Sequence, residues 1–312
     1  MRHRRLGTSG LSVSRLALGT MTWGTVLDGE VCRDQLRTYL DAGGNLLDTA
    51  FGYGGGAAES LVGSFLGDVV AREDLVISTK AGIERRGTER VVDTSRGTLL
   101  RQLDTSLRRL QTDHVDLWLV HTWSDEAPLA ETMSALEYAV GSGKARYVGV
   151  SNYSGWQSAR AFSLLESARI PLVANEVEYS MIHRDPEREL APAAESLGFG
   201  LLPWSPLARG VLSGKYRNGV PSDSRAASRD FPNFVERFLD GRSTTIVEAV
   251  ATAARGLQVS PTEVSLAWLR DRPGVVAPIV GARTTSQLRT ALASEDLELP
   301  PQLIEALDEI SA

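Results

Sequence analysis

Short apolar segments alternate with amphipathic segments along most of the chain, and this alternation predicts the fold. Eight segments are mostly apolar, as in the runs Leu-Val-Ile-Ser and Val-Asp-Leu-Trp-Leu-Val. Such runs are typical of strands in a parallel sheet that helices cover. The predicted strands are residues 15–21, 45–50, 75–80, 115–121, 145–151, 172–179, 200–205 and 275–281.

Segments with helical periodicity lie between these strands. Ser260-Pro261-Thr262-Glu263 places a capping serine, a first-turn proline and a capping-box glutamate in register, so a helix is expected to begin there. The other predicted helices are residues 30–42, 58–66, 94–110, 128–141, 155–168, 186–197 and 245–256. About eight strand–helix repeats predict an α/β protein with a single (β/α)₈ TIM-barrel domain over residues 1–312; a doubly wound open sheet is the nearest alternative.

Two regions lie outside a minimal barrel. Residues 6–13 place turn-forming residues between short apolar pieces, which predicts a hairpin before the first barrel strand. Residues 207–245, after the seventh strand, are polar and rich in Gly, Ser and Arg. Connections longer than about 12–15 residues are uncommon unless they are functional or disordered. We therefore expect a long loop over the active face.

Composition and charge narrow the class of protein. With 42% hydrophobic and 23% charged residues, the 312-residue chain supplies a sizeable core. A net charge of -6 argues against nucleic acid as a partner. Cys32, the one cysteine, cannot form an internal disulfide and is interpreted as a packing residue. The basic start is not followed by a long apolar stretch, and no run approaches the roughly 18 apolar residues of a membrane span, so a cytoplasmic protein without a membrane partner is expected.

Common catalytic motifs are missing from the sequence. The glycine cluster at 52–56 fails the dinucleotide-binding pattern because Glu59 occupies its last glycine position. No H-E-x-x-H, paired C-x-x-C or G-x-S-x-G motif occurs, and the chain has only four histidines. We therefore expect neither a metal site nor a serine nucleophile.

Four polar residues stand where barrel enzymes place their chemistry, at the carboxyl ends of strands. Asp48 ends the second predicted strand, Tyr53 follows in the next loop, Lys80 ends the third strand and His121 ends the fourth. Each one has a structural interpretation when taken alone, such as a turn cap, a solvated strand end or a core histidine. A barrel would bring all four together, which favours a shared site.

This set suggests a proton donor. A free tyrosine has a pKa of about 10, and a neighbouring ammonium lowers it. Lys80 would supply that ammonium, Asp48 would keep it charged and oriented, and His121 would orient a carbonyl oxygen or donate to it. Because the set contains no nucleophile, the attacking species is expected to come from a cofactor, with hydride the natural candidate.

The chain resembles the aldo-keto reductase family from near its start to about residue 295, through motifs that are specific in their order and spacing. These motifs are Leu18-Gly19-Thr20-Met21, Asp48-Thr49-Ala50 with Tyr53-Gly54, Ser78-Thr79-Lys80, Leu119-Val120-His121, Val148-Gly149-Val150-Ser151-Asn152, Glu178-Tyr179-Ser180, Trp204-Ser205-Pro206-Leu207 with Gly210, and Gly281-Ala282-Arg283 with Gln287-Leu288.

The resemblance implies an NADPH-dependent reductase of aldehydes or ketones on a barrel without a Rossmann domain. It implies that Tyr53 is the general acid, that Lys80 and Asp48 tune it, and that His121 positions the carbonyl. It also implies that Trp204 stacks on the nicotinamide. The implied cofactor contacts are Gly19, Thr20, Met21, Asp48, Ser151, Asn152, Glu176, Trp204, Ser205, Leu207, Gly210, Lys215, Gly281, Arg283 and Gln287.

Three positions depart from the family pattern. Glu176 stands where the family usually has glutamine, and a carboxylate cannot donate a hydrogen bond to the carboxamide unless it is protonated. Thr290-Ala291 replaces a frequent Glu-Asn pair, which is expected to weaken the adenine contacts. Arg283 still favours NADPH over NADH, because a guanidinium suits a planar anion with several oxygens.

Three aromatic residues are expected to form the substrate pocket. Trp23, Phe51 and Trp123 would line an apolar, aromatic pocket for a medium-sized carbonyl compound. Sugars, quinones, keto-steroids and simple aldehydes all remain open as substrates, as does the oligomeric state.

The alternative function is an NADPH-sensing regulatory subunit resembling potassium-channel β-subunits. Repeated turnover would indicate an enzyme rather than such a sensor.

Overall fold

A computed structural model describes residues 1–87, 89–221, 224 and 235–312. Its main sheet has eight parallel strands in the order β11-β10-β9-β8-β5-β4-β3-β12. All eight lie where the sequence predicts strands. Their bounds are β3 Ala17–Gly19, β4 Leu46–Asp48, β5 Val76–Ala81, β8 Val115–Val120, β9 Ala145–Ser151, β10 Leu172–Glu178, β11 Gly200–Trp204 and β12 Ile279–Val280.

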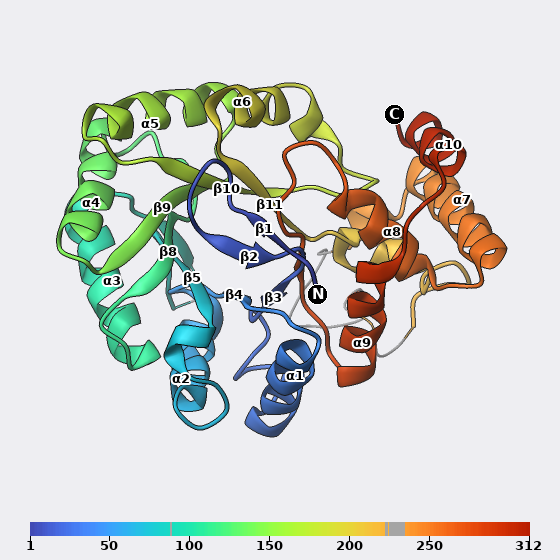
Figure 1. Ribbon diagram of the computed structural model, residues 1–312, viewed down its shortest axis with the longest axis horizontal. Coiled ribbons are helices and arrows are strands. Elements are labelled where there is room, and N and C mark those ends of the chain that lie inside the picture. The colour runs from blue at the N-terminus through green and yellow to red at the C-terminus, as the bar shows by residue number, and fades with distance from the viewer. Residues whose placement is uncertain (88, 222–223, 225–234) are drawn as a thin grey trace.

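The two edges of the sheet meet, which makes a nearly closed barrel. Leu201 of β11 forms a parallel bridge with Val275, just before β12. The backbone N–H of Leu201 donates to the carbonyl oxygen of Gly274 at 2.8 Å, and the N–H of Val276 donates to that of Leu201 at 2.9 Å. The predicted (β/α)₈ barrel is confirmed, with helices forming an outer ring around the strands (Figure 1).

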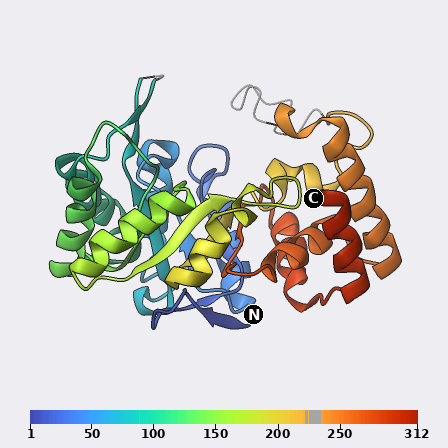
Figure 2. The ribbon, with the colours of Figure 1, turned by 90° about the horizontal axis from the view of Figure 1, so that it is seen from above.

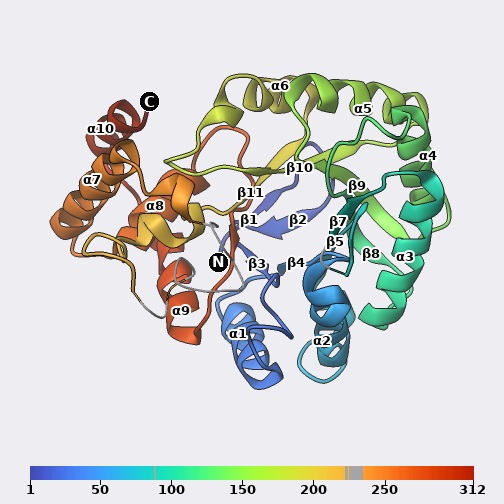
Figure 3. The ribbon, with the colours of Figure 1, turned by 180° about the vertical axis from the view of Figure 1, so that it is seen from behind.

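The outer ring follows the predicted helices, with two further helices at the end of the chain. The Ser260 cap is confirmed: Ser260 Oγ accepts from the Glu263 N–H at 3.2 Å, and the Glu263 carboxylate accepts from the Ser260 N–H at 2.8 Å. In Figure 3 the ring is seen from the opposite end. The helices are α1 Gly29–Asp41, α2 Ala57–Phe65, α3 Arg96–Leu110, α4 Leu129–Gly141, α5 Gly155–Ser167, α6 Leu190–Leu197, α7 Gly241–Leu257, α8 Pro261–Arg270, α9 Thr285–Ala293 and α10 Pro301–Ser311.

The N-terminal hairpin covers the amino end of the barrel. Its strands β1 His3–Arg5 and β2 Ser12–Ser14 pair antiparallel, which confirms the predicted hairpin. Leu6 in its turn is fully buried in one cluster with the lumen residues Leu117 and Leu119. Gly7 adopts φ +57°, and a Cβ there would lie 2.4 Å from the carbonyl oxygen of Gly198, just before β11. The hairpin therefore seals this end.

A second hairpin rises from the opposite end and was not predicted. It consists of β6 Ile83–Arg86 and β7 Glu89–Val92, between β5 and α3. In Figure 2 the teal segment and the blue N-terminal hairpin lie at opposite ends of the molecule. The carboxyl ends of the barrel strands therefore open on the side of β6 and β7.

The predicted long loop after the seventh strand lies partly outside the described residues, at 222–223 and 225–234. Its described parts include two short 3₁₀ helices, η4 Ala208–Ser213 and η6 Glu236–Phe238, and helix α7 then begins at Gly241. No helix in the described part of the chain is both long and apolar enough to cross a membrane.

Leu6 provides a test of whether the N-terminal hairpin seals the amino end of the barrel. Leu6→Ala is expected to lower the free energy of unfolding by about 2–5 kcal/mol, because it opens a cavity in a fully packed lumen. Urea denaturation measures the change. Leu11→Ala, at a half-buried position of the same hairpin, should cost clearly less. Equal effects of the two substitutions would show that the hairpin does not seal the lumen.

Candidate active site

A buried lysine organises the carboxyl end of the barrel lumen. Lys80 of β5 donates from Nζ to Asp48 Oδ1 at 2.6 Å and Oδ2 at 2.7 Å. The same Nζ lies 2.8 Å from Oε2 of Glu176 on β10. Lys80 is 0% exposed, and both carboxylates are buried. One ammonium is therefore shared by two carboxylates that come from different strands.

Tyr53 and His121 lie beside this cluster. Tyr53 begins the short helix η1 Tyr53–Gly56, where Gly54, Gly55 and Gly56 adopt positive φ and turn the chain tightly after β4. Lys80 Nζ lies 5.4 Å from the centroid of the Tyr53 ring, and the centroids of the Tyr53 and His121 rings are 6.0 Å apart in an edge arrangement. The four residues predicted at the strand ends are thus brought together.

Burial, more than the lysine, sets the acidity of Tyr53. Burial raises the pKa of the Tyr53 phenol, Lys80 lowers it, and Asp48 and Glu176 raise it. The pKa therefore stands above its ordinary value, contrary to the expected lowering. The main reason is burial, which opposes the charged phenolate more than the Lys80 ammonium favours it. The phenol keeps its proton at neutral pH.

Around Tyr53, Lys80 and Asp48 form a charged pair, whereas Glu176 and His121 are neutral. Burial opposes the charge of Lys80, but Asp48 and Glu176 outweigh it and raise the lysine pKa. Burial and then the Asp48 charge raise the pKa of Glu176 to about 8. Burial and then Lys80 lower the pKa of His121 well below its ordinary value, so the imidazole is neutral. Its buried Nδ1 has no hydrogen-bond partner among the described residues.

A polar chain runs along the ends of β9, β10 and β11. Ser151 Oγ donates to the carbonyl oxygen of Glu176 at 3.0 Å. Asn152 adopts φ +58°, and its Nδ2 donates to Ser151 Oγ and to the carbonyl oxygen of His121, each at 3.0 Å. Trp204 Nε1 donates to Asn152 Oδ1 at 3.0 Å. These bonds fix the amide of Asn152 beside a half-buried indole ring.

The turn after β11 carries several of the remaining predicted residues. Ser205 has φ +52°, half-buried Leu207 precedes η4, and Gly210 has φ +95°. A Cβ at Gly210 would lie 2.8 Å from Lys215 Nζ, so the glycine leaves room for the lysine to lie against the turn. The turn therefore places the Lys215 ammonium next to the backbone at Gly210.

The ends of β3 and β12 hold the rest of the predicted set. Gly19 and Gly281 are neighbours, since a Cβ on Gly281 would lie 3.8 Å from the carbonyl oxygen of Gly19. Thr20 is buried and its Oγ1 donates to the carbonyl oxygen of Asp48 at 3.0 Å, while Met21 is exposed. Arg283 and Gln287 complete the set. Arg283 is half-buried, and its backbone N–H donates to Oε1 of exposed Gln287 at 3.0 Å.

The three aromatic residues predicted for the pocket have different surroundings. Trp23 is 0% exposed, its Nε1 donates to Gln35 Oε1 at 3.3 Å, and its ring packs edge-on against Phe65. Trp23 therefore belongs to the core, and its expected place in the pocket lining is wrong. Trp23 lies two residues beyond the predicted first strand, and this distance alone does not indicate the direction of its side chain. Phe51 is nearly buried, and half-buried Trp123 is the more accessible of the three.

Two aromatic residues that the sequence analysis did not select pack against Trp123. The ring centroids of Tyr153 and Trp156 lie 5.1 and 5.4 Å from that of Trp123, both edge-on. Both follow Asn152 closely in the chain, which was the available signal. A pocket of about 410 Å³ adjoins them, and its lining includes Tyr153, Asn152 and Trp204.

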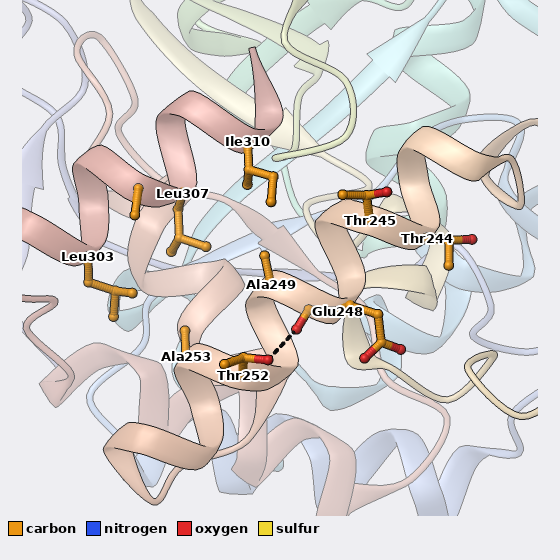
Figure 4. Close-up of a pocket in the computed structure, with 10 residues that line it drawn as sticks. Thr244, Thr245, Glu248, Ala249, Thr252, Ala253, Leu303, Leu307 and Ile310 are labelled. Atoms are coloured by element: carbon orange, nitrogen blue, oxygen red, sulfur yellow. Dashed lines mark hydrogen bonds between the residues drawn. The ribbon is translucent and has the colours of Figure 1, made fainter.

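A second and larger hollow, of about 640 Å³, lies between α7 and α10 (Figure 4). Small and aliphatic residues such as Ala249, Ala253, Leu303 and Leu307 line it, and Glu248 is its one ionisable lining residue. It therefore offers a single carboxylate, which is paired with Arg217, and no second ionisable group to work with it. Within the described ranges, no group of three or more His, Cys, Asp or Glu side chains is placed to hold a metal ion.

The same chain matches a known family over almost its full length. A sequence model described as the aldo/keto reductase family matches residues 15–312. The protein belongs to the aldo/keto reductase family. This confirms the resemblance seen in the sequence motifs, and family membership supports an oxidoreductase that acts on small carbonyl compounds.

Three named relatives are similar to this chain along most of its length. The uncharacterized oxidoreductase YrpG of Bacillus subtilis is 34% identical, with 99% of this chain and 96% of the relative covered. L-glyceraldehyde 3-phosphate reductase of Escherichia coli (strain K12) is 34% identical, with 92% and 86% covered. A probable voltage-gated potassium channel subunit beta of Oryza sativa is also 34% identical, with 100% and 96% covered.

The raised pKa of Glu176 predicts a pH-dependent stability difference. The folded protein holds the Glu176 proton up to about pH 8, whereas the unfolded chain releases it near pH 4.5. The wild type therefore loses stability relative to Glu176→Gln as the pH rises between these values, by at most about 1.4 kcal/mol per pH unit. Urea denaturation at pH 5, 6, 7 and 8 measures the difference.

Glu248→Gln is the control for this measurement. The hydrogen bond from Arg217 lowers the pKa of exposed Glu248, so its contribution is complete before pH 5 and its difference from the wild type should stay constant. A Glu176→Gln difference that is equally constant would show that Glu176 is ionised throughout this range.

Proposed function

We propose that the protein is an NADPH-dependent reductase that converts an aldehyde or ketone to an alcohol, with Tyr53 as general acid. The observation that carries this proposal is the buried Lys80–Asp48 pair beside the rings of Tyr53 and His121. Family membership supplies the reaction class. The set contains a proton donor, a neutral hydrogen-bonding imidazole and a fixed positive charge, which suit the reduction of a carbonyl group.

The donor set along β9 to β12 fits a nicotinamide dinucleotide. The Asn152 amide and the Ser151 hydroxyl suit the carboxamide, and the Trp204 ring suits the nicotinamide face. Lys215, which lies in the space left by Gly210, and Arg283 suit the phosphates. When bound, the reduced cofactor supplies the hydride.

The residues of this chain would handle the proton. The Tyr53 O–H bond breaks as the substrate oxygen gains negative charge, and the proton moves to that oxygen. Lys80 then stabilises the phenolate by its charge, and Asp48 holds the ammonium in place. His121, being neutral, orients the substrate oxygen by hydrogen bonding without competing for the proton.

Glu176 takes a definite part in this scheme. Because its pKa is raised to about 8, its carboxyl group is protonated at neutral pH and has an O–H to donate. It would then serve the carboxamide as the usual glutamine does in the family. Lys80 remains paired with Asp48, and its charge is available to the Tyr53 phenolate.

The substrate is a medium-sized or small carbonyl compound. Trp123, Tyr153 and Trp156 would form an aromatic wall beside the polar ends of β9 and β11. Phosphorylated aldehydes belong in a substrate panel, since one relative is named L-glyceraldehyde 3-phosphate reductase.

A regulatory subunit that binds NADPH is the second candidate function, and the plant relatives named as probable potassium channel β-subunits favour it. The two candidates differ in turnover. An enzyme oxidises many equivalents of NADPH per protein with an aldehyde, whereas a sensor stops after about one equivalent.

Tyr53→Phe tests the proposed acid. The substitution removes the O–H and is expected to lower kcat by about 10²–10⁴-fold, the usual range for general acid catalysis, with the fold intact. NADPH absorbance measures the rate, and circular dichroism checks the fold. Tyr138→Phe, at an exposed position on α4, should keep the wild-type rate. An unchanged rate in Tyr53→Phe would disprove the mechanism.

Arg283→Ala tests the cofactor preference. The loss of charged hydrogen bonds to a phosphate, worth about 1.5–3 kcal/mol, is expected to raise the KM for NADPH about 10–100-fold and to leave the KM for NADH nearly unchanged. Arg289→Ala, at an exposed position on α9, is the matched control. Equal increases for both cofactors would assign Arg283 to a shared part of the dinucleotide.

A further inference from the structure

The loop that carries Tyr53 is held by an arginine from a neighbouring helix. Arg109, near the end of α3, donates from Nη1 to the carbonyl oxygen of Phe51 at 2.9 Å and from Nη2 to that of Gly55 at 3.3 Å. These carbonyl groups lie two residues before and two residues after Tyr53. One planar guanidinium thus ties the loop backbone on both sides of the tyrosine.

Arg109 is itself fixed by a buried carboxylate. Its Nη1 also lies 3.0 Å from Oε2 of Glu59, a residue of α2 that is 0% exposed. The other oxygen of Glu59 accepts from Thr79 Oγ1 at 2.7 Å. Thr79 directly precedes Lys80, and since side chains alternate along a strand, Thr79 faces the helices while Lys80 faces the lumen. Glu59 therefore links the Tyr53 loop to the strand that carries Lys80.

The packing around the guanidinium leaves it little freedom. Arg109 Cζ lies 4.5 Å from the centroid of the Phe51 ring. Gly56 has φ +104°, and a Cβ there would lie only 2.2 Å from Arg109 Cζ. The guanidinium occupies the space that any other residue at position 56 would need for its side chain, so loop and arginine fit as one unit.

We propose that Arg109 and Glu59 are positioning residues that fix the Tyr53 hydroxyl relative to Lys80. This inference rests on the proposed role of Tyr53 as proton donor. A proton transfer depends on atoms held within hydrogen-bond distance, and a misplacement of about 1 Å costs about 10²-fold in rate. A lysine cannot replace this arginine, because a single ammonium lacks the planar fork that reaches both carbonyl groups and the carboxylate.

The experiment compares Arg109→Met with Arg33→Met. Arg33 of α1 is similarly exposed (25% against 23%), pairs with a carboxylate, Asp68, and lies over the ring of Phe65 at 5.1 Å. Its partners lie outside residues 51–56. Arg109→Met is expected to lower kcat about 10–100-fold and to leave the dissociation constant for NADPH, measured by protein fluorescence, within about twofold. Arg33→Met should leave both unchanged.

Two readouts separate positioning from general damage. In the Tyr53→Phe background, Arg109→Met should cause no further loss of kcat, because the group that it positions is already gone. In the protein without ligand, amide hydrogen exchange over residues 51–57 should become faster in Arg109→Met and stay unchanged in Arg33→Met. If Arg109→Met does not fold, Arg109→Lys, which keeps the charge beside Glu59, is compared in the same way and should also lose kcat.

Three results would overturn the inference: a normal kcat in Arg109→Met, an equal loss in the wild-type and Tyr53→Phe backgrounds, or unchanged exchange over residues 51–57. Failure of the proposed function looks different, because Tyr53→Phe alone would then keep the wild-type rate.

Discussion

The site depends on one ammonium group that is buried inside the barrel. Lys80 is completely buried, and a buried charge is costly unless it is paired and hydrogen-bonded. Asp48 reaches it from the adjacent strand β4, and Glu176 reaches it from β10 on another part of the barrel wall. The closure of the barrel brings these groups together. The Lys80 charge acts on both neighbouring groups: it favours the Tyr53 phenolate and keeps His121 neutral.

With both carboxylates ionised, the cluster would carry one net negative charge in a buried place. Shifted pKa values resolve this: Glu176 and Tyr53 keep their protons because their pKa values are raised, and His121 stays neutral because burial and Lys80 both oppose its charge. The lumen then contains one compensated ion pair surrounded by neutral groups. A buried ion pair of this kind adds little stability, but removal of either partner is strongly destabilising.

The sequence predicted the barrel and the four strand-end residues because both depend on repeating patterns. It did not predict the β6–β7 hairpin, since five of the seven residues from Glu84 to Arg90 are charged and the segment has no clear apolar alternation. It assigned Trp23 the wrong surroundings because the distance from a strand does not set a side-chain direction. The expected sign of the Tyr53 pKa shift was also wrong, because burial of the phenol outweighs the effect of Lys80, and burial depends on the folded packing rather than on neighbouring residues in the sequence.

The N-terminal hairpin gives the barrel a floor, so molecules reach the lumen from one side only. Leu6 and the turn at Gly7 close the amino end with apolar contacts and backbone packing. The loops at the other end are thus left to determine which molecules are admitted. Sequence drift in those loops can alter selectivity while the floor keeps the scaffold intact, and the two properties can evolve through separate sets of residues.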